Sequence, residues 1–493
     1  MIRPYLNFLP ALLAGIATVG AFAPFGWYLL VVPALALLFY QWSRDTPRVA
    51  CLRGALFGIG LFGAGVSWVY VSIHTYGNVP VVLSGLIALL LILVMAAFPA
   101  LAGYLARRCC PGPGAVVMVL AMPSAWLLSE WLRGWLLSGF PWLNLGASQI
   151  DGPLAGYLAL TGEYGVTWLL ACTAGVFAAV LRQPGRFVLL LVPVLLWVAG
   201  ELLGRVAWTV PRGAPLRVAV VQGNVAQDQK WLPENLESTL QRYLDMTFDG
   251  EPSDLYLWPE TAIPAFYDQV DEVFIPALTA RLEERGAALL TGIPVLDREH
   301  WRYYNSVISL ADEPHFYYKQ HLVPFGEYVP LRPLLGFIVD KLVPMNGDFS
   351  RGGPDQPLLQ AGDLPVGATI CFEVVFSRLI AAQARAAALL VNVSNDGWFG
   401  DSLAPHQHLE IARVRARETG RAMLRATNTG ISAIIDPQGN IAARSRQFEQ
   451  AVVRGTVTPS QGNTPFVLLG NWPVLMVALV ALMVARLAGR RAR

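Results

Sequence analysis

Residues 366–373 read Val-Gly-Ala-Thr-Ile-Cys-Phe-Glu, an apolar run that ends on a cysteine and is followed by a carboxylate. Short apolar runs of this kind are typical of buried β-strands. Seven more strand-like runs share the pattern, at 216–222, 254–258, 287–291, 305–310, 389–394, 423–427 and 431–435. Amphipathic helical patterns separate several of them, at 233–248, 271–285, 374–387 and 405–420. This alternation predicts an α/β domain whose strands pack under helices.

Two more strand-like runs end on residues that can take part in catalysis. Glu260 ends the run Leu-Tyr-Leu-Trp-Pro-Glu, and Lys319 ends the run His-Phe-Tyr-Tyr-Lys. Because a thiol is nucleophilic as the thiolate, its expected neighbours are a base and a cation. We therefore expect Cys371 as nucleophile, Glu260 as proton acceptor, and Lys319 as stabiliser of the thiolate and oxyanion, helped by the N–H of Phe372. The alternatives are a turn carboxylate, a solvated edge lysine and a buried cysteine.

The rest of the chain is too apolar for an ordinary soluble protein, because 55% of its 493 residues are hydrophobic and only 14% are charged. A bilayer core needs roughly 20 apolar residues per helix. Seven candidate spans precede the α/β domain and an eighth follows it, at about 5–22, 25–42, 54–74, 79–103, 115–133, 162–181, 187–203 and 466–485. We expect the first to be retained rather than cleaved. The net charge of +2 gives no indication of nucleic acid binding.

The arginines of the short connections predict the orientation of these spans. They fall on every second connection, at Arg3, at Arg44, Arg48 and Arg53, at Arg107 and Arg108, and at Arg182 and Arg186, and the tail after the last span is also basic. We expect both termini to be cytoplasmic and the α/β domain to be extracytoplasmic. The predicted domains are a membrane domain at 1–211, a catalytic domain at 212–462, and a final span with a basic tail at 463–493.

The cysteines fit this division, because Cys371 is the only cysteine in the predicted extracytoplasmic domain. It therefore has no disulfide partner there. A single thiol in an oxidising compartment is either used for its reactivity or buried and inert. The sequence alone leaves both possibilities open.

The order and flanks of Glu260, Lys319 and Cys371 resemble the nitrilase superfamily over about 216–458. Nearly the whole chain resembles the bacterial apolipoprotein N-acyltransferase family. The matching motifs are Glu130-Trp-Leu-Arg-Gly-Trp, Gly139-Phe-Pro-Trp, Gln222-Gly-Asn, Trp258-Pro-Glu-Thr-Ala, Lys319-Gln-His-Leu-Val-Pro-Phe-Gly-Glu-Tyr-Val-Pro, Cys371-Phe-Glu and Asn395-Asp-Gly-Trp-Phe-Gly.

The resemblance implies a multispan α-helical membrane domain joined to a nitrilase-like αββα sandwich in the bacterial inner membrane. It implies ping-pong acyl transfer from a phospholipid, through a cysteine thioester, to the α-amino group of the diacylglyceryl-cysteine of apolipoproteins. No cofactor and no metal are expected. The alternative is a membrane-anchored, nitrilase-type amide hydrolase, which would use the same triad but gives no reason for eight spans.

The resemblance also implies roles for residues around the triad. Glu327 matches a supporting glutamate, and its alternative is a solvated loop carboxylate. Trp231 matches a tryptophan near the substrate entrance and Glu373 an acid beside the nucleophile, and both are expected to contact the substrate, although both could be packing or surface residues. Phe372 stands where some relatives have Tyr, so a contact to lipid is expected of it but no hydroxyl chemistry.

Two further features have open alternatives. Glu130 and Arg133 lie three residues apart near the end of a span, where a simple interfacial ion pair is expected and a headgroup site is the alternative. The segment 322–339 is rich in Pro and Gly yet strongly apolar. It is either a loop buried against the domain or an arm that dips into lipid.

Overall fold

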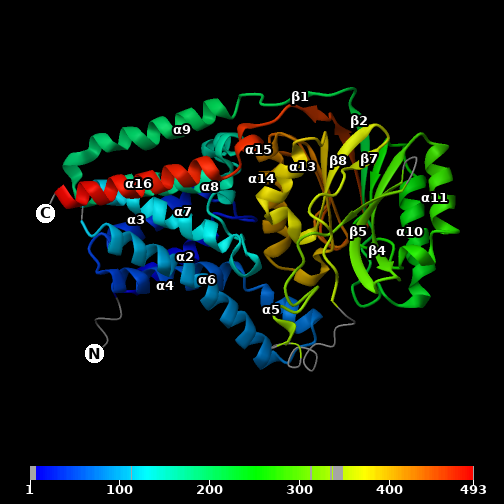
Figure 1. The fold of residues 1–493 in the computed structure, drawn as a ribbon, viewed down its shortest axis with the longest axis horizontal. Helices are drawn as coiled ribbons and strands as arrows, with labels where there is room; N and C mark the ends of the chain where they lie inside the picture. The colour runs from blue at the N-terminus through cyan, green and yellow to red at the C-terminus, as the bar shows by residue number, and fades with distance from the viewer. Residues whose placement is uncertain (1–6, 113, 311–313, 334–335, 337–347, 492–493) are drawn as a thin grey trace.

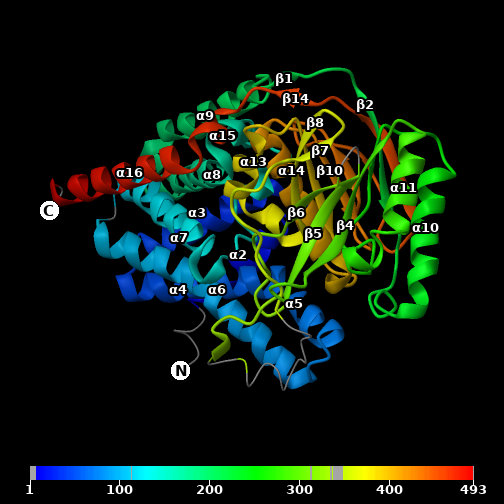
Figure 2. The same ribbon diagram turned by 45° about the vertical axis from the view of Figure 1, so that its right-hand side comes forward.

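The computed structural model describes residues 7–112, 114–310, 314–333, 336 and 348–491. It contains a helical body and an α/β domain, which lie side by side in Figures 1 and 2. The chain passes from the helical body into the α/β domain after residue 203 and returns before residue 465. The predicted fold class, a helical domain joined to an αββα sandwich, is confirmed.

Helices occupy most of the described residues of the eight predicted spans. The helices are α2 (Leu9–Val19), α3 (Val31–Trp42), α4 (Pro47–Gly65), α5 (Val69–Val71), α6 (Val81–Cys109), α7 (Met122–Arg133), α8 (Leu158–Arg182), α9 (Leu191–Leu203), α15 (Pro465–Leu469) and α16 (Trp472–Arg491). Among the described residues, five helical segments are long and apolar enough to cross a membrane: Pro47–Gly65, Val81–Cys109, Pro153–Arg182, Pro184–Leu203 and Trp472–Gly489. The Leu9–Val19 and Tyr28–Trp42 helices are apolar but shorter, so the count of eight spans stays a prediction.

Glycines allow the helices of this body to approach one another closely. A Cβ added to Gly15 of α2 would lie 2.0 Å from the carbonyl oxygen of Phe57 in α4. A Cβ on Gly54 of α4 would lie 2.3 Å from the carbonyl oxygen of Pro99 in α6. Backbone contact through small residues is a common way for helices to associate in lipid, where no hydrophobic effect drives them together.

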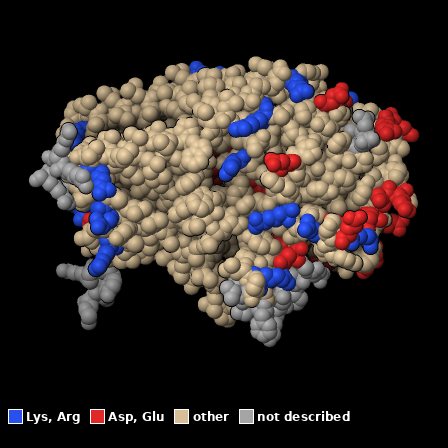
Figure 3. Space-filling view, viewed as in Figure 1, with Lys and Arg blue, Asp and Glu red and all other residues tan. Residues whose placement is uncertain are grey.

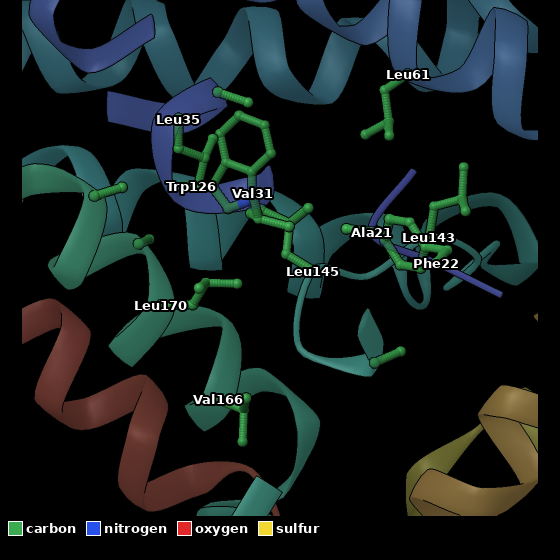
Figure 4. Close-up of a cluster of buried hydrophobic side chains, with 14 of the residues drawn as sticks. Ala21, Phe22, Val31, Leu35, Leu61, Trp126, Leu143, Leu145, Val166 and Leu170 are labelled. Atoms are coloured by element: carbon green, nitrogen blue, oxygen red, sulfur yellow. The ribbon is translucent and has the colours of Figure 1, made fainter. Parts of the chain in front are cut away.

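The buried interior also holds irregular backbone from two connections. Leu143 and Leu145, from the segment that follows α7, lie in one buried cluster with Phe22, which precedes α3. Figure 4 shows Leu143 beside Phe22, and Trp126 of α7 in the same interior. The loop after α7 is therefore part of the core of the helical body and is held in a fixed position.

Two six-stranded sheets form the centre of the α/β domain. The first has the order β13-β2-β3-β4-β5-β6 and the second β12-β11-β10-β9-β8-β7. In each sheet three central strands run parallel and the outer pairs run antiparallel. Their bounds are β2 (Leu216–Gln222), β3 (Leu255–Leu257), β4 (Ala288–Asp297), β5 (Arg302–Leu310), β6 (His315–Tyr318), β7 (Leu359–Ala361), β8 (Leu364–Ile370), β9 (Leu389–Ser394), β10 (Met423–Thr427), β11 (Ala433–Ile435), β12 (Ile441–Arg444) and β13 (Ala451–Val457).

The sheets pack face to face through valines, leucines and alanines of both. The outer face of the first sheet is covered by α10 (Leu236–Phe248) and α11 (Phe274–Glu283). The second sheet is covered by α13 (Ser377–Ala384) and α14 (Ala404–Thr419), which lie between it and the helical body in Figures 1 and 2. The two sheets and the helices on their outer faces form the four layers of the αββα sandwich.

Polar contacts join α14 to the helical body. The Oε1 atom of Gln407 accepts a hydrogen bond of 2.7 Å from the indole of Trp142. Arg415 forms buried ion pairs with Glu163 of α8 and, at 3.0 Å, with Glu418. Buried charges of this kind need mutual pairing, so the interface between the two parts is specific rather than a loose contact.

The α/β domain is connected to the helical body by two segments that run together. The short strand β1 (Val210–Pro211) pairs antiparallel with β14 (Ser460–Gln461). After this pairing, α16 packs into the helical body, where Val474 and Ala478 share a buried cluster with Leu127 of α7 and Tyr164 of α8. The last helix therefore completes the helical body.

Charged side chains are absent from the middle of the helical body on the face that Figure 3 shows. Figure 3 shows a broad surface without them, with Lys and Arg at the end away from the α/β domain. The α8–α9 connection and the end of α16 lie at that end in Figure 1. This pattern agrees with a membrane-spanning body, while the sidedness stays a prediction.

Candidate active site

Three strand ends carry the predicted catalytic residues. Glu260 follows β3, Lys319 follows β6 and Cys371 follows β8. The Nζ atom of Lys319 lies 3.8 Å from Oε1 of Glu260. The charges of both residues act on the thiol of Cys371. The structure thus brings the carboxylate, the ammonium and the thiol into one site.

Cys371 occupies a sharp backbone turn. Its φ of +52° lies in the left-handed region, and the 3-10 helix Cys371–Val375 begins there. A non-glycine residue in this conformation is strained, and such strain is concentrated at functional sites. Burial raises the pKa of the Cys371 thiol to about 12, with a further increase from Glu260 and an opposing effect from Lys319. The resting thiol is therefore protonated at neutral pH and needs a base.

Lys319 lies in a buried ion pair with Glu327, at 2.8 Å. Burial alone would lower the pKa of Lys319, but Glu327 and Glu260 outweigh it and hold the pKa above its ordinary value. The second oxygen of Glu327 accepts a hydrogen bond of 2.8 Å from the N–H of Val323. Lys319 is therefore a permanent cation, suited to stabilising negative charge rather than to transferring protons.

Glu260 is held by two donors that the sequence analysis did not identify. The Nδ2 atom of Asn305 donates to Oε1 of Glu260 at 2.7 Å and to Glu327 at 3.1 Å. The backbone N–H of Asn395 donates to Oε2 of Glu260 at 2.8 Å. Asn305 stands in the buried part of β5, where an amide among apolar residues could have marked it as a site residue.

Glu373 is fully buried, and both of its carboxylate oxygens have hydrogen-bond donors. Its carboxylate accepts hydrogen bonds from the N–H groups of Gln320, His321 and Ile370, at 2.6, 3.0 and 2.8 Å, and from the hydroxyl of Tyr317. Burial raises the pKa of Glu373 to about 7, against the opposing effects of Lys319 and these N–H groups. Glu373 thus joins the loop after Lys319 to the turn that holds Cys371, which favours a positioning role over the substrate contact expected from the sequence.

Aromatic residues of the helical body reach Phe372, the residue that follows Cys371. The ring of Phe372 stacks on Trp142, with centroids 6.5 Å apart and planes 13° apart, and on Phe140 at 6.4 Å. Phe376 meets Phe372 edge-on at 5.2 Å. These rings form an apolar wall beside Cys371 at the junction of the two parts. Trp231, by contrast, is half exposed on the segment between β2 and α10.

The expectation of a simple interfacial pair between Glu130 and Arg133 is wrong. Both side chains are buried, and no direct ion pair joins them among the described residues. Arg133 instead donates to the carbonyls of Phe140 and Trp142 and, at 2.7 Å, to Oδ1 of Asn144. Glu130 accepts from the N–H of Leu145 at 3.0 Å. Buried backbone groups of the loop require hydrogen-bond partners, and the two charged side chains supply them instead of pairing with each other. These bonds fix the loop that carries Phe140 and Trp142, the rings of the apolar wall.

The apolar segment 322–339 is described only in part, because 334, 335 and 337–347 lie outside the described residues. Leu322 and Val329 are buried, whereas Phe325 and Leu331 are exposed. The described portion thus has one apolar side against the domain and another facing outwards. The choice between a buried loop and a lipid-dipping arm stays open.

Comparisons with known proteins cover both parts of the chain. Residues 14–176 match the family described as "Apolipoprotein N-acyltransferase N-terminal domain", and residues 217–463 match "Carbon-nitrogen hydrolase". The chain is 47% identical to the apolipoprotein N-acyltransferase of Methylococcus capsulatus, over 95% of this chain and 93% of that protein. It is 44% identical to that of Pseudomonas putida, over 98% and 97%. A nitrilase-superfamily crystal structure from Saccharomyces cerevisiae matches 50% of this chain and 90% of its own, at 19% identity and a TM-score of 0.38.

Proposed function

The chain belongs to the apolipoprotein N-acyltransferase family, and we propose that it transfers an acyl chain from a phospholipid to the α-amino group of diacylglyceryl-cysteine in apolipoproteins, through a thioester on Cys371. The observation that carries the proposal is the location of the triad. The Glu260, Lys319 and Cys371 site lies against aromatic rings supplied by the helical body. An enzyme whose substrates are lipids needs its nucleophile at such a junction.

In the first half-reaction, Sγ of Cys371 attacks the ester carbonyl of the phospholipid while Glu260 accepts the thiol proton. The oxyanion that forms faces the ammonium of Lys319 and the N–H of Phe372. When the tetrahedral intermediate collapses, the carbon–oxygen bond of the ester breaks and Glu260 returns the proton to the leaving alkoxide. The products are a lysophospholipid and the acyl thioester.

In the second half-reaction, the α-amine of the apolipoprotein attacks the thioester carbonyl. Glu260 accepts a proton from the amine, and the amide forms as the carbon–sulfur bond breaks. The departing sulfur takes the proton back and restores the thiol of Cys371. Because the same base and cation serve both steps, two substrates can use one site in turn, which is the basis of a ping-pong reaction.

Water must be kept from the thioester for transfer to outrun hydrolysis. Lys319 is 1% exposed and Glu260 is 7% exposed, so the base and the cation are kept from bulk water, while Cys371 is partly exposed beside the aromatic rings that pack on Phe372. The burial of the base supports the acyltransferase over the alternative, a membrane-anchored amide hydrolase, which must admit water to its acyl-enzyme.

The proposed location is the bacterial inner membrane, with both termini cytoplasmic and the α/β domain periplasmic. The arginine-bearing connections and the basic end of the helical body in Figure 3 support it. The proposed partners are a phospholipid donor and diacylglyceryl-modified apolipoproteins. Trp231, on the exposed segment after β2, is proposed to contact them, and Glu327 is proposed to support the triad.

The test is the intact mass of the purified protein with and without phospholipid, before and after neutral hydroxylamine. We expect a fatty-acyl adduct that hydroxylamine removes and that passes to a diacylglyceryl-cysteinyl peptide. The Cys371→Ala variant should form none, while Cys51→Ala, which removes a thiol of α4, should behave like the wild type. Glu260→Gln and Lys319→Ala should fail to accumulate the thioester.

Either of two outcomes would refute the proposal. An adduct that passes only to water would make the protein a hydrolase. An adduct retained by Cys371→Ala would place the covalent step on another residue.

A further inference from the structure

His408 of α14 lies behind the nucleophile and has no part in the reaction described above. Its ring is fully buried, and Nε2 lies 3.2 Å from the carbonyl oxygen of Cys371. A second donor, Nδ2 of Asn392, lies 3.4 Å from the same oxygen. This carbonyl belongs to the residue with a φ of +52°, so its partners bear directly on the strained turn.

The other ring nitrogen faces a buried ion pair. Nδ1 of His408 lies 3.0 Å from Oδ1 of Asp396 and 2.9 Å from Nη2 of Arg425. Asp396 has further donors, since its Oδ1 accepts from Ser394 at 2.7 Å and its Oδ2 accepts from Arg425 at 2.8 Å. Each oxygen of Asp396 therefore has a donor other than the imidazole.

The positions of these donors and acceptors indicate which nitrogen carries the proton. A carbonyl oxygen only accepts hydrogen bonds, so Nε2 must carry the hydrogen that reaches Cys371. A neutral imidazole has no second N–H, and Nδ1 then accepts from the guanidinium of Arg425. Burial lowers the pKa of His408, and the charge of Arg425 lowers it further while Asp396 opposes. The direction of this shift agrees with the neutral ring.

We propose that His408, as the neutral imidazole protonated on Nε2, is a positioning residue that holds the carbonyl of Cys371 and thereby fixes the turn that presents the thiol. The inference rests on the proposed function, in which Cys371 forms the thioester. His408 touches neither substrate nor reacting atom. It acts through the backbone of the nucleophile.

The helical body determines where this support lies. The residue before His408 is Gln407, which bonds to Trp142 and, through Nε2 at 3.1 Å, to the carbonyl of Gly65 at the end of α4. The rings of His408 and Trp142 are 5.5 Å apart. One turn of α14 therefore contacts the helical body through Gln407 and the backbone of Cys371 through His408. This turn fixes the position of the thiol relative to the helical body.

The test compares His408→Leu, which removes the donor, with His408→Gln, whose amide can donate from nearly the same place. At saturating phospholipid, His408→Leu should form the thioester about 10- to 100-fold more slowly, as expected for loss of a buried hydrogen bond at the reacting residue. The phospholipid concentration at half-maximal rate should not change. His408→Gln should remain within about threefold of the wild type, as should the control His406→Gln on the same helix.

Alkylation of Cys371 by iodoacetamide gives a readout that needs no acyl donor. His408→Leu should react more slowly than both the wild type and His408→Gln. A wild type that is alkylated but forms no thioester would refute the proposed function and leave the positioning role to be judged from these alkylation rates. Equal alkylation and acylation rates in all three proteins would overturn the positioning role alone.

Nitrogen-15 NMR of histidine-labelled wild type reports the protonation state of His408 in the unaltered protein, with the signal assigned by its absence from His408→Gln. This signal should show a hydrogen on Nε2 and none on Nδ1 at pH 7. An imidazolium, with hydrogen on both nitrogens, would overturn the assigned protonation state.

Discussion

Replacing Glu327 by Gln should slow thioester formation because it frees Lys319 to neutralise the base. In the wild type, Lys319 pairs with Glu327 at 2.8 Å and keeps 3.8 Å from Glu260. The amide of Gln has nearly the same size as the carboxylate but carries no charge. The ammonium, which is buried and needs an anion, should then move towards Glu260.

The separations in the structure give the size of the effect. Closing the Lys319–Glu260 gap from 3.8 to 2.8 Å strengthens their attraction by about 1.6 kcal/mol at an effective dielectric constant near 20. Glu260 gives up this attraction when it accepts the thiol proton. The barrier rises by the same amount, so the acylation rate should fall about 15-fold.

The assay is quenched-flow acylation followed by intact mass, at saturating phospholipid and pH 7.5. The matched control is Glu410→Gln, because the pKa of buried Glu410 is raised to about 8, chiefly by burial, and the side chain is already mostly neutral at pH 7.5. Its acylation rate should equal that of the wild type. A Glu327→Gln enzyme within twofold of the wild type would refute the reasoning, since Lys319 would then not be restrained by Glu327.

Two further predictions concern residues that hold the surroundings of the site in place, Glu373 and Arg133. The pKa of Glu373 is raised to about 7, so the carboxylate that binds the neighbouring N–H groups is present above pH 7 and is lost as the pH falls. The acylation rate of the wild type should therefore fall as the pH drops below 7. Glu373→Gln should be slower at every pH but should not show this fall near pH 7. The same pH dependence in the variant and the wild type would contradict the positioning role of Glu373. Arg133→Met should leave loop acceptors in 140–144 unpaired, at about 1–3 kcal/mol each, and so lower the unfolding midpoint in scanning fluorimetry; an unchanged midpoint would show that the loop does not need this guanidinium.

The strand ends could be predicted from sequence because their signals are local. A run of apolar residues identifies a buried strand, and a charged or nucleophilic residue at its end is visible beside it. The boundaries of β2, β9 and β10 agree with the predicted runs. The short strands β7 and β12 and the half-buried β13 were missed, because few of their residues are buried and their sequences resemble connecting loops.

The partners of the triad could not be predicted, because they come from distant parts of the chain. Asn305 and His408 look like ordinary strand and helix residues until the fold brings them to Glu260 and Cys371. The amphipathic pattern predicted for helix 405–420 includes a polar face, which in many helices faces solvent. In the structure that face is buried against the helical body through Gln407 and Arg415. A polar protein interface and a solvated face share the same pattern.

The pairing of β1 with β14 and the place of α16 have a consequence for biosynthesis. The two connections enter and leave the α/β domain together, so that domain is an insertion in the chain of the helical body. The ribosome makes α16 after the α/β domain, and only then do Leu127 and Tyr164 gain Val474 and Ala478 as neighbours. Until then, the apolar side chains of α7 and α8 that pack against α16 lack these neighbours. Assembly of the membrane part must therefore wait for a domain of more than two hundred residues to be made.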